Sequence, residues 1–249
     1  MKMSHRMRRT VAGAVFLAGV GAWLIINPAS YETEVTSVEV ADEGAGGERG
    51  SAEGAGSSVD ANSNSPLATE VLEKLEVKGR APKTGYARTE FYNNWPDVDG
   101  CSLRQRIIKR EVGDSAVLEG CNVVAGHFIE PYTGEERNYT TREEFSKNIQ
   151  IDHIVALSDA WQKGAQYMEK DVRYQIATDP LNLIAADGPA NMQKSDGDAA
   201  TWLPPNKKFR CEYVARQVAV KYKYHLWVTE AEKDAMNNVL STCPNQKTY

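Results

Sequence analysis

The residues with the clearest chemical potential lie in one stretch, 149–196. His153 follows Asp152 at the end of an apolar run, and Asn191 and Lys194 come three residues apart in a later polar block. A neutral histidine suits the role of general base because its pKa lies near physiological pH. Asp152 and Asn191 offer the oxygen ligands that Mg²⁺ prefers, and Lys194 can contact a phosphate. These residue types together predict hydrolysis of a phosphodiester.

The order of these residues suggests how they are held. Asp152 and His153 are adjacent on an expected strand, so their side chains should point to opposite faces. We expect a twist at the strand end to aim Asp152 at a metal ion and His153 at a water molecule. Asn182, 29 residues after His153, should either accept the imidazole N–H or tie two strands together. Lys194 lies about one helical turn beyond Asn191, on the same expected helix face.

Hydrophobic spacing predicts the elements on the N-terminal side. A helix should begin near Ser65 and end at Gly79, and a second helix should begin near Ser102. Arg104 lies on the basic face of that second helix, which is either solvated surface or a phosphate contact. Residues 116–141 alternate apolar with polar side chains around a turn and predict a β-hairpin.

Helices are also expected in the second half of the chain. One should occupy the insertion Ser158–Arg173, and two more should cover about 208–223 and 229–241. Thr229 is the expected N-cap of the last helix, and Glu232 three residues later predicts a capping box.

The chain has four cysteines. They form no CxxC pair and no zinc-like cluster, so a structural zinc site is not expected. An even number behind an export signal predicts two disulfides, with four free buried thiols as the alternative. Of the three pairings we favour the one in which each bond closes a loop within its own region, Cys101–Cys121 and Cys211–Cys243.

The N-terminal quarter of the chain is unlike a folded domain. Residues 1–29 combine basic side chains with an apolar run from Val11 to Ile26, which predicts export. This run of 16 residues is long for a cleaved signal peptide and short for a transmembrane helix, which needs about 20 apolar residues. Cleavage and retention as an N-terminal membrane anchor therefore both stay open. Residues 30–64 are acidic and rich in Gly and Ser, which predicts a disordered linker. The remaining domain, 65–249, is close to neutral, so nucleic-acid binding would need a local patch.

The pattern IDHIV, LNL and N..K resembles the HNH nuclease superfamily, whose fold is a ββα-metal finger. The wider context is similar to the secreted bacterial HNH family related to the C-terminal domain of GmrSD-type restriction enzymes. It comprises Arg88, Phe91, Trp95 and Asp97 before Cys101, and the segments EPYTG, DHIVALSDAW, NLIAA and WLPPN. The resemblance covers about 85–249. It implies an α+β fold in which the finger, 149–196, is embedded in a mostly helical domain with a small β-hairpin and two disulfides.

The resemblance also implies a role for each polar residue of the motif. His153 would be the general base, and Asn182 would hold the finger and orient His153. Asp152 and Asn191 would bind a divalent metal, Mg²⁺ with Mn²⁺ as the alternative. Ala156 departs from the family, which commonly has Pro there. Because this is a framework position, we expect activity to be retained.

The expected protein is a secreted or surface-tethered endonuclease, a monomer without a protein partner, that acts on DNA rather than RNA. The sequence leaves open the choice between nicking and double-strand cleavage. One alternative is a non-catalytic envelope or binding module that keeps the finger as a scaffold, an idea favoured by the near-neutral domain. Another is a phosphatase or nucleotidase that cleaves small phosphate esters and spares plasmid DNA.

Overall fold

The computed structural model describes residues 64–249. The export segment expected at 1–29 and nearly all of the linker expected at 30–64 lie outside these residues. Within 64–249, no helix is long and apolar enough to cross a membrane.

Two antiparallel strands followed by a helix carry the chemically interesting residues. β6 (Ile149–His153) pairs with β7 (Leu183–Asp187) along its whole length. α6 (Gly188–Lys194) begins directly after β7. The Asp187 carboxylate caps α6 by accepting a hydrogen bond from the backbone N–H of Ala190. The chain therefore passes from strand to helix without an intervening loop.

Both faces of the β6–β7 pair are buried, by different layers. One face packs against α2 (Leu103–Val112) and carries Ile149, Ile151, Leu183 and Ala185. On the other face, Ile184 and Ala186 share a core with residues of α7 (Arg210–Lys223). Burial on both sides explains why β7 reads as a nearly continuous apolar run, whereas β6 alternates and exposes Gln150.

The segment predicted as a single hairpin forms a three-stranded antiparallel sheet, which corrects that prediction. β4 (Asn122–Ile129) is central, with β3 (Val117–Glu119) on one side and β5 (Glu136–Tyr139) on the other. All three residues of β3 are exposed, so no alternation of burial marks that strand in the sequence. α2 and α3 (Arg142–Asn148) pack on β4.

Both disulfides join the expected pairs of cysteines. The Cys101–Cys121 bond links β2 (Cys101–Ser102), which pairs with β1 (Asp97–Val98), to the residue before β4. The Cys211–Cys243 bond links α7 to the turn after α8 (Glu230–Leu240). Each bond closes a loop of the chain, which lowers the entropy of the unfolded state.

The helix predicted over Ser158–Arg173 is broken into shorter pieces. Gly164, with φ of 126°, follows α4, and a Cβ atom there would lie 3.2 Å from the Trp227 ring. Close packing at a positive φ therefore ends the helix. The pieces between β6 and β7 are α4 (Leu157–Gln162), the 3₁₀ turn η3 (Ala165–Tyr167), α5 (Lys170–Thr178) and η4 (Pro180–Asn182).

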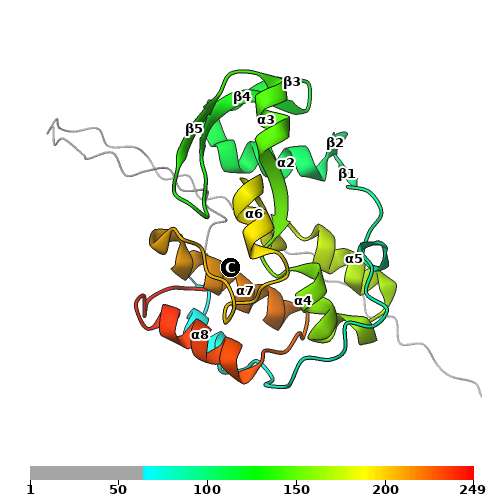
Figure 1. The fold of residues 1–249 in the computed structure, drawn as a ribbon, viewed down its shortest axis with the longest axis vertical. Helices are drawn as coiled ribbons and strands as arrows, with labels where there is room; N and C mark the ends of the chain where they lie inside the picture. The colour runs from blue at the N-terminus through cyan, green and yellow to red at the C-terminus, as the bar shows by residue number, and fades with distance from the viewer. Residues whose placement is uncertain (1–63) are drawn as a thin grey trace, which may run out of the picture. The chain divides into compact units, whose positions relative to one another are not determined.

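The first helix is shorter than predicted, whereas the last two match. α1 (Ala68–Leu72) ends well before Gly79, because Val77 forms a β-bridge with Val228 and the chain is extended there. Further 3₁₀ turns lie at η1 (Arg88–Glu90), η2 (Gly113–Ser115) and η5 (Lys207–Phe209). Figure 1 shows α6 between the β3–β4–β5 sheet on one side and α7 with α8 on the other.

A buried ion-pair network joins α4 to α7 and α8. Lys163 Nζ lies 2.6 Å from Glu232 Oε2 and 2.8 Å from Asp198 Oδ2. Lys221 on α7 lies 3.1 Å from Asp159 on α4 and 3.0 Å from Glu232. Thr229 caps α8 as predicted, but the Glu232 side chain turns inward to these lysines and does not complete the capping box. The network fixes the helices that follow His153 along the chain.

Candidate functional site

The end of β6 places Asp152 and His153 on opposite faces of the strand pair. The ladder is regular through His153, which lies opposite Leu183, so no irregularity of pairing marks the strand end. His153 shares its face with Ile151, toward α2. Asp152 shares its face with Gln150, toward α6. The two candidate side chains thus belong to two separate environments.

Two aromatic rings enclose the His153 imidazole. The Trp95 ring stacks on it with a centroid distance of 6.1 Å and an interplanar angle of 14°. The Tyr92 ring lies 6.0 Å away in a tilted arrangement. As a result only 4% of His153 is exposed. The imidazole lies in a largely apolar environment that disfavours its charged form.

A backbone carbonyl fixes the proton on the His153 ring. Nε2 lies 3.0 Å from the Ala177 carbonyl oxygen, which can only accept a hydrogen bond. Nε2 therefore carries the proton in the neutral ring and Nδ1 keeps its lone pair. Burial lowers the pKa of His153 to about 4, helped by the positive charges of Arg88 and Lys194 and opposed by Asp152. The imidazole is neutral at physiological pH, as a general base must be.

Asn182 holds the backbone around His153 and makes no hydrogen bond to the imidazole. Its Oδ1 accepts from the Val155 backbone N–H at 2.8 Å, and its Nδ2 donates to the Ile176 carbonyl at 2.9 Å. Ile176 precedes Ala177, whose carbonyl accepts from the imidazole. Of the two roles expected for Asn182, the structure places it in the one that ties chain segments together. Its contacts near His153 are therefore with the backbone.

The Asp152 carboxylate is held by two donors on one of its oxygens. Tyr132 Oη donates to Oδ2 at 2.5 Å, and Lys194 Nζ lies 2.9 Å from the same atom. No hydrogen bond to Oδ1 is formed within residues 64–249. The carboxylate thus has a compensating cation and one oxygen left for a further ligand.

The two side chains expected to contact phosphate are occupied elsewhere. Lys194 is 1% exposed, and its ammonium also donates to the His153 carbonyl at 2.8 Å. Arg104 donates to the Ile149 carbonyl at 3.0 Å, and burial lowers the pKa of its guanidinium. Lys194 in particular is not presented to solvent, where a phosphate contact would need it.

Asn191 lies on the same side of β6 as Asp152. Its Nδ2 donates to Gln150 Oε1 at 2.9 Å, which turns its Oδ1 away from Gln150. Asp152 Oδ1 and Asn191 Oδ1 are hard oxygen donors of the kind that Mg²⁺ and Mn²⁺ take, and they fit such an ion in donor type. No group of three or more His, Cys, Asp or Glu residues within 64–249 is arranged to hold a metal ion. Water and substrate oxygens would have to complete its coordination.

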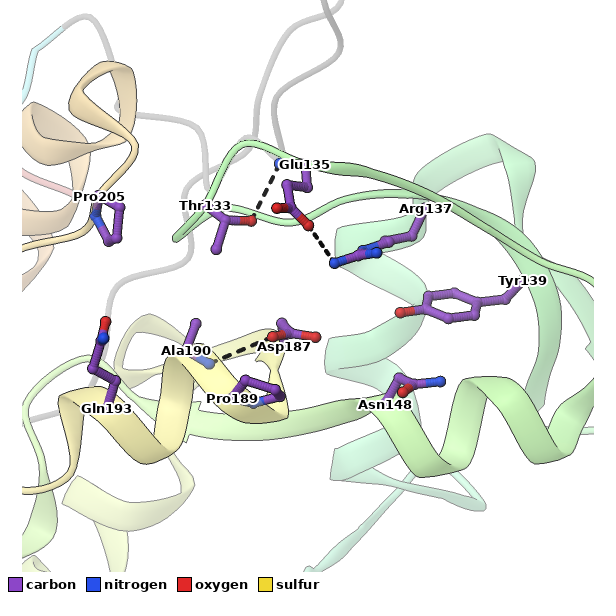
Figure 2. A pocket seen from close by; sticks show the side chains of 10 residues that line it. All are labelled: Thr133, Glu135, Arg137, Tyr139, Asn148, Asp187, Pro189, Ala190, Gln193 and Pro205. Atoms are coloured by element: carbon purple, nitrogen blue, oxygen red, sulfur yellow. Dashed lines mark hydrogen bonds and ion pairs between the residues drawn. The ribbon is translucent and has the colours of Figure 1, made fainter.

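A groove of about 530 Å³ lies beside α6, on the side that faces β5 (Figure 2). Arg137 in this groove is paired with Glu135, and Asp187 caps α6. Neither Asp152 nor His153 lines the groove. It is therefore a feature next to α6 and separate from the imidazole.

Sequence reasoning did not identify the groups that surround the two candidate side chains. Tyr92 and Trp95 enclose His153, and Tyr132 holds Asp152. Trp95 belongs to the sequence context that resembles the family, without an assigned role, and the concentration of aromatic residues in 86–95 was the available signal for Tyr92. Ala177 contributes through its carbonyl, which no side-chain pattern reveals.

Comparison with known proteins agrees with the resemblance in the sequence. The chain is 33% identical over 179 residues to a protein of Arthroderma benhamiae described as an uncharacterised secreted protein, and this match covers 71% of the chain and 84% of the relative. No solved structure matches the chain. The family described as GmrSD restriction endonucleases, C-terminal domain, matches residues 112–239. These residues include both strands and α6, and the chain belongs to this family of restriction-endonuclease C-terminal domains.

Proposed function

We propose that this protein is a secreted, metal-dependent HNH endonuclease in which β6, β7 and α6 form the ββα finger. The observation that carries the proposal is the neutral His153 at the end of β6, with Nε2 fixed by the Ala177 carbonyl and Nδ1 left as a base. Asp152 Oδ1 and Asn191 Oδ1 would hold the metal ion, on the side of β6 that faces α6. The family supports the same reaction class.

The chain's own residues account for the proton transfer. His153 Nδ1 accepts a proton from a water molecule as the water oxygen attacks phosphorus and the bond to the 3′-oxygen breaks. Asn182 and Ala177 keep the imidazole in the tautomer that this step needs. A bound Mg²⁺ would stabilise negative charge on the phosphate and the leaving oxygen. Because His153 is nearly buried, the proposal requires Trp95 to move aside when substrate binds.

Several features support export. The two disulfides suit an oxidising compartment, and the relative from Arthroderma benhamiae is described as secreted. The apolar run Val11–Ile26 would direct export and, if retained, would tether the protein to the membrane. We propose DNA as the main substrate of a monomeric enzyme.

The decisive experiment is a plasmid-nicking assay on the purified protein, with and without Mg²⁺. We expect Mg²⁺-dependent nicking that His153→Ala abolishes while the variant remains folded and keeps its metal affinity. His127→Ala is the matched control, because His127 is a half-exposed histidine of β4 that pairs with Glu136. Wild-type nicking by His153→Ala would overturn the assignment of the base.

A second candidate function is a secreted binding module that keeps the finger as a scaffold. The covering of His153 and the pairing of Lys194 with Asp152 favour it, because both lower access to the reacting groups. In that case the purified protein would bind a nucleic acid or envelope partner but leave plasmid intact at every Mg²⁺ and Mn²⁺ concentration. A phosphatase or nucleotidase would instead cleave small phosphate esters and spare the plasmid.

A further inference from the structure

Most arginines of residues 64–249 already have a partner for their charge. Six form ion pairs with carboxylates: Arg80, Arg106, Arg110, Arg137, Arg173 and Arg216. Arg104 and Arg210 donate to backbone carbonyls. Arg142 is exposed on α3 and forms no ion pair with another described residue. Arg88 also forms none, but a neutral phenol holds its guanidinium.

Tyr92 holds the Arg88 side chain in one place. Arg88 Nε donates to Tyr92 Oη at 3.0 Å, and Nη2 donates to the same oxygen. The guanidinium carbon also lies 5.1 Å from the centroid of the Tyr92 ring. Arg88 is nevertheless exposed. The contacts order the side chain without neutralising it, so its charge is available to an anion from solvent.

The same tyrosine links Arg88 to the candidate base. The Tyr92 ring contacts the His153 imidazole at a centroid distance of 6.0 Å. One ring therefore separates an ordered, uncompensated guanidinium from the group that would activate water. Lys194, the other cation near this point, is buried against Asp152.

We propose that Arg88, positioned by Tyr92, forms a phosphate-binding site next to His153 and takes a backbone phosphate of the nucleic-acid substrate. This inference rests on the proposed nuclease function. A guanidinium presents a planar fork of donors that matches phosphate oxygens, so a two-bond contact would orient the phosphodiester toward the imidazole. The site supplies the local positive charge that a near-neutral domain needs to bind a polyanion.

The salt dependence of binding gives a direct test. A fluorescent DNA duplex is titrated with the protein in EDTA at several NaCl concentrations. Each phosphate contact contributes about 0.9 to the slope of log K against log salt for duplex DNA. Arg88→Gln should lower the slope by about that amount, whereas Arg88→Lys should keep it because the charge remains. Arg142→Gln is the matched control, since Arg142 is an exposed arginine of α3, and its slope should equal that of wild type.

Cleavage measurements with Mg²⁺ add a second reading. Loss of a charged hydrogen bond predicts a roughly 10- to 100-fold lower kcat/KM for Arg88→Gln. Arg88→Lys should recover part of the loss, because lysine restores the charge and not the fork. Tyr92→Phe should keep the salt slope and lower kcat/KM by less than Arg88→Gln does.

The outcomes separate this inference from the proposed function. An Arg88→Gln slope equal to that of wild type would show that Arg88 touches no phosphate, even if the wild-type enzyme cleaves DNA. An equal fall in slope for Arg142→Gln would mean that only the total charge matters, and would also overturn the site. Failure of the wild type to cleave any nucleic acid would instead refute the nuclease function and leave the salt-slope result to stand for binding.

Discussion

The Lys194 ammonium lies 2.9 Å from Asp152 Oδ2 inside the protein, so the carboxylate proposed as a metal ligand already has a cation beside it. The ammonium is fixed by a second bond, to the His153 carbonyl at 2.8 Å. Lys194 thus joins α6 to both residues of the Asp-His pair. A structural role at the site follows from these contacts, and metal binding at Asp152 would have to share the carboxylate with the lysine.

Replacing Lys194 by methionine should separate these two effects. Lys194→Met keeps the length of the side chain and leaves the Asp152 charge uncompensated. Breaking a buried ion pair in this way costs about 3–5 kcal/mol, to be measured as the free energy of unfolding in urea. Mg²⁺ should raise the melting temperature of this variant more than that of wild type, because the ion can replace the lost positive charge.

Lys147→Met is the matched control for that experiment. Lys147 is an exposed lysine of α3, and exposed substitutions usually change stability by less than about 0.5 kcal/mol. If Lys194→Met cost no more than Lys147→Met, the ion pair with Asp152 would contribute nothing to stability.

Replacing Asn182 should damage both stability and catalysis. Asn182→Ala removes the acceptor of the Val155 N–H and the donor to the Ile176 carbonyl. Each buried group left without a partner costs about 1–3 kcal/mol. The Ala177 carbonyl would lose its fixed position, so kcat should fall along with the melting temperature. Asn182→Asp keeps an acceptor for Val155 but buries a carboxylate against the Ile176 carbonyl, so its loss of stability should be at least as large as that of Asn182→Ala.

A smaller loss of stability in Asn182→Asp than in Asn182→Ala would argue against this account, because the bond from Asn182 to the Ile176 carbonyl would then contribute nothing. So would a normal kcat in folded Asn182→Ala, since positioning of the imidazole through Ala177 would be unnecessary.

The parts of the fold that were predicted correctly depend on local patterns. The C-terminal helices follow from apolar spacing and from Thr229, whose side chain caps α8. The disulfide pairs follow from the regions in which the cysteines lie. Errors arose where distant contacts override local preference. The predicted helix ends at Gly164 because Trp227 packs against this glycine. The first helix ends before Val77, which instead forms a β-bridge with Val228.

The candidate site shows the same division. The types of Asp152 and His153 and their place at a strand end could be read from the sequence. The burial of Lys194 could not be read from the sequence, because it depends on the Asp152 carboxylate, 42 residues earlier in the chain. The position of Arg88 likewise depends on Tyr92 and on the packing of that ring against His153. A spacing pattern identifies which groups are available and does not fix which of them already have partners.

The buried network around Asp198 should make the protein sensitive to acid. Burial by itself would raise the pKa of Asp198, but Lys163 and Arg80 hold the pKa well below its ordinary value. The unfolded chain binds a proton at this carboxylate near pH 4, and the folded chain does so only at lower pH. This contribution to stability is therefore complete above about pH 5 and is lost as the pH falls through and below 4.

Urea unfolding of Asp198→Asn at several pH values measures that contribution. At pH 7 we expect a loss of about 3 kcal/mol, the lower end for a broken buried pair, because Lys163 keeps Asp159 and Glu232. The difference from wild type should shrink below pH 4. Asp234→Asn, at an exposed aspartate of α8, is the control and should change the free energy of unfolding at pH 7 by less than about 0.5 kcal/mol. A constant gap between Asp198→Asn and wild type from pH 7 to pH 3 would contradict the assigned pKa direction.

Metal dependence should respond to Asn191 and to the residue that orients it. Treatment with EDTA should abolish cleavage, and Mg²⁺ should restore it. Asn191→Ala removes one of two proposed protein ligands, so the Mg²⁺ concentration for half-maximal activity should rise by at least about 10-fold. Groups that only support a ligand already have effects of that size.

Gln150→Ala should raise the Mg²⁺ concentration for half-maximal activity as well, because the Gln150 Oε1 atom holds the Asn191 amide at 2.9 Å. Gln193→Ala, two positions further along α6 and exposed, should give the wild-type titration. If the Asn191→Ala titration also overlaid that of wild type, Asn191 would not be a ligand, and cleavage that survives EDTA would remove the metal from the mechanism.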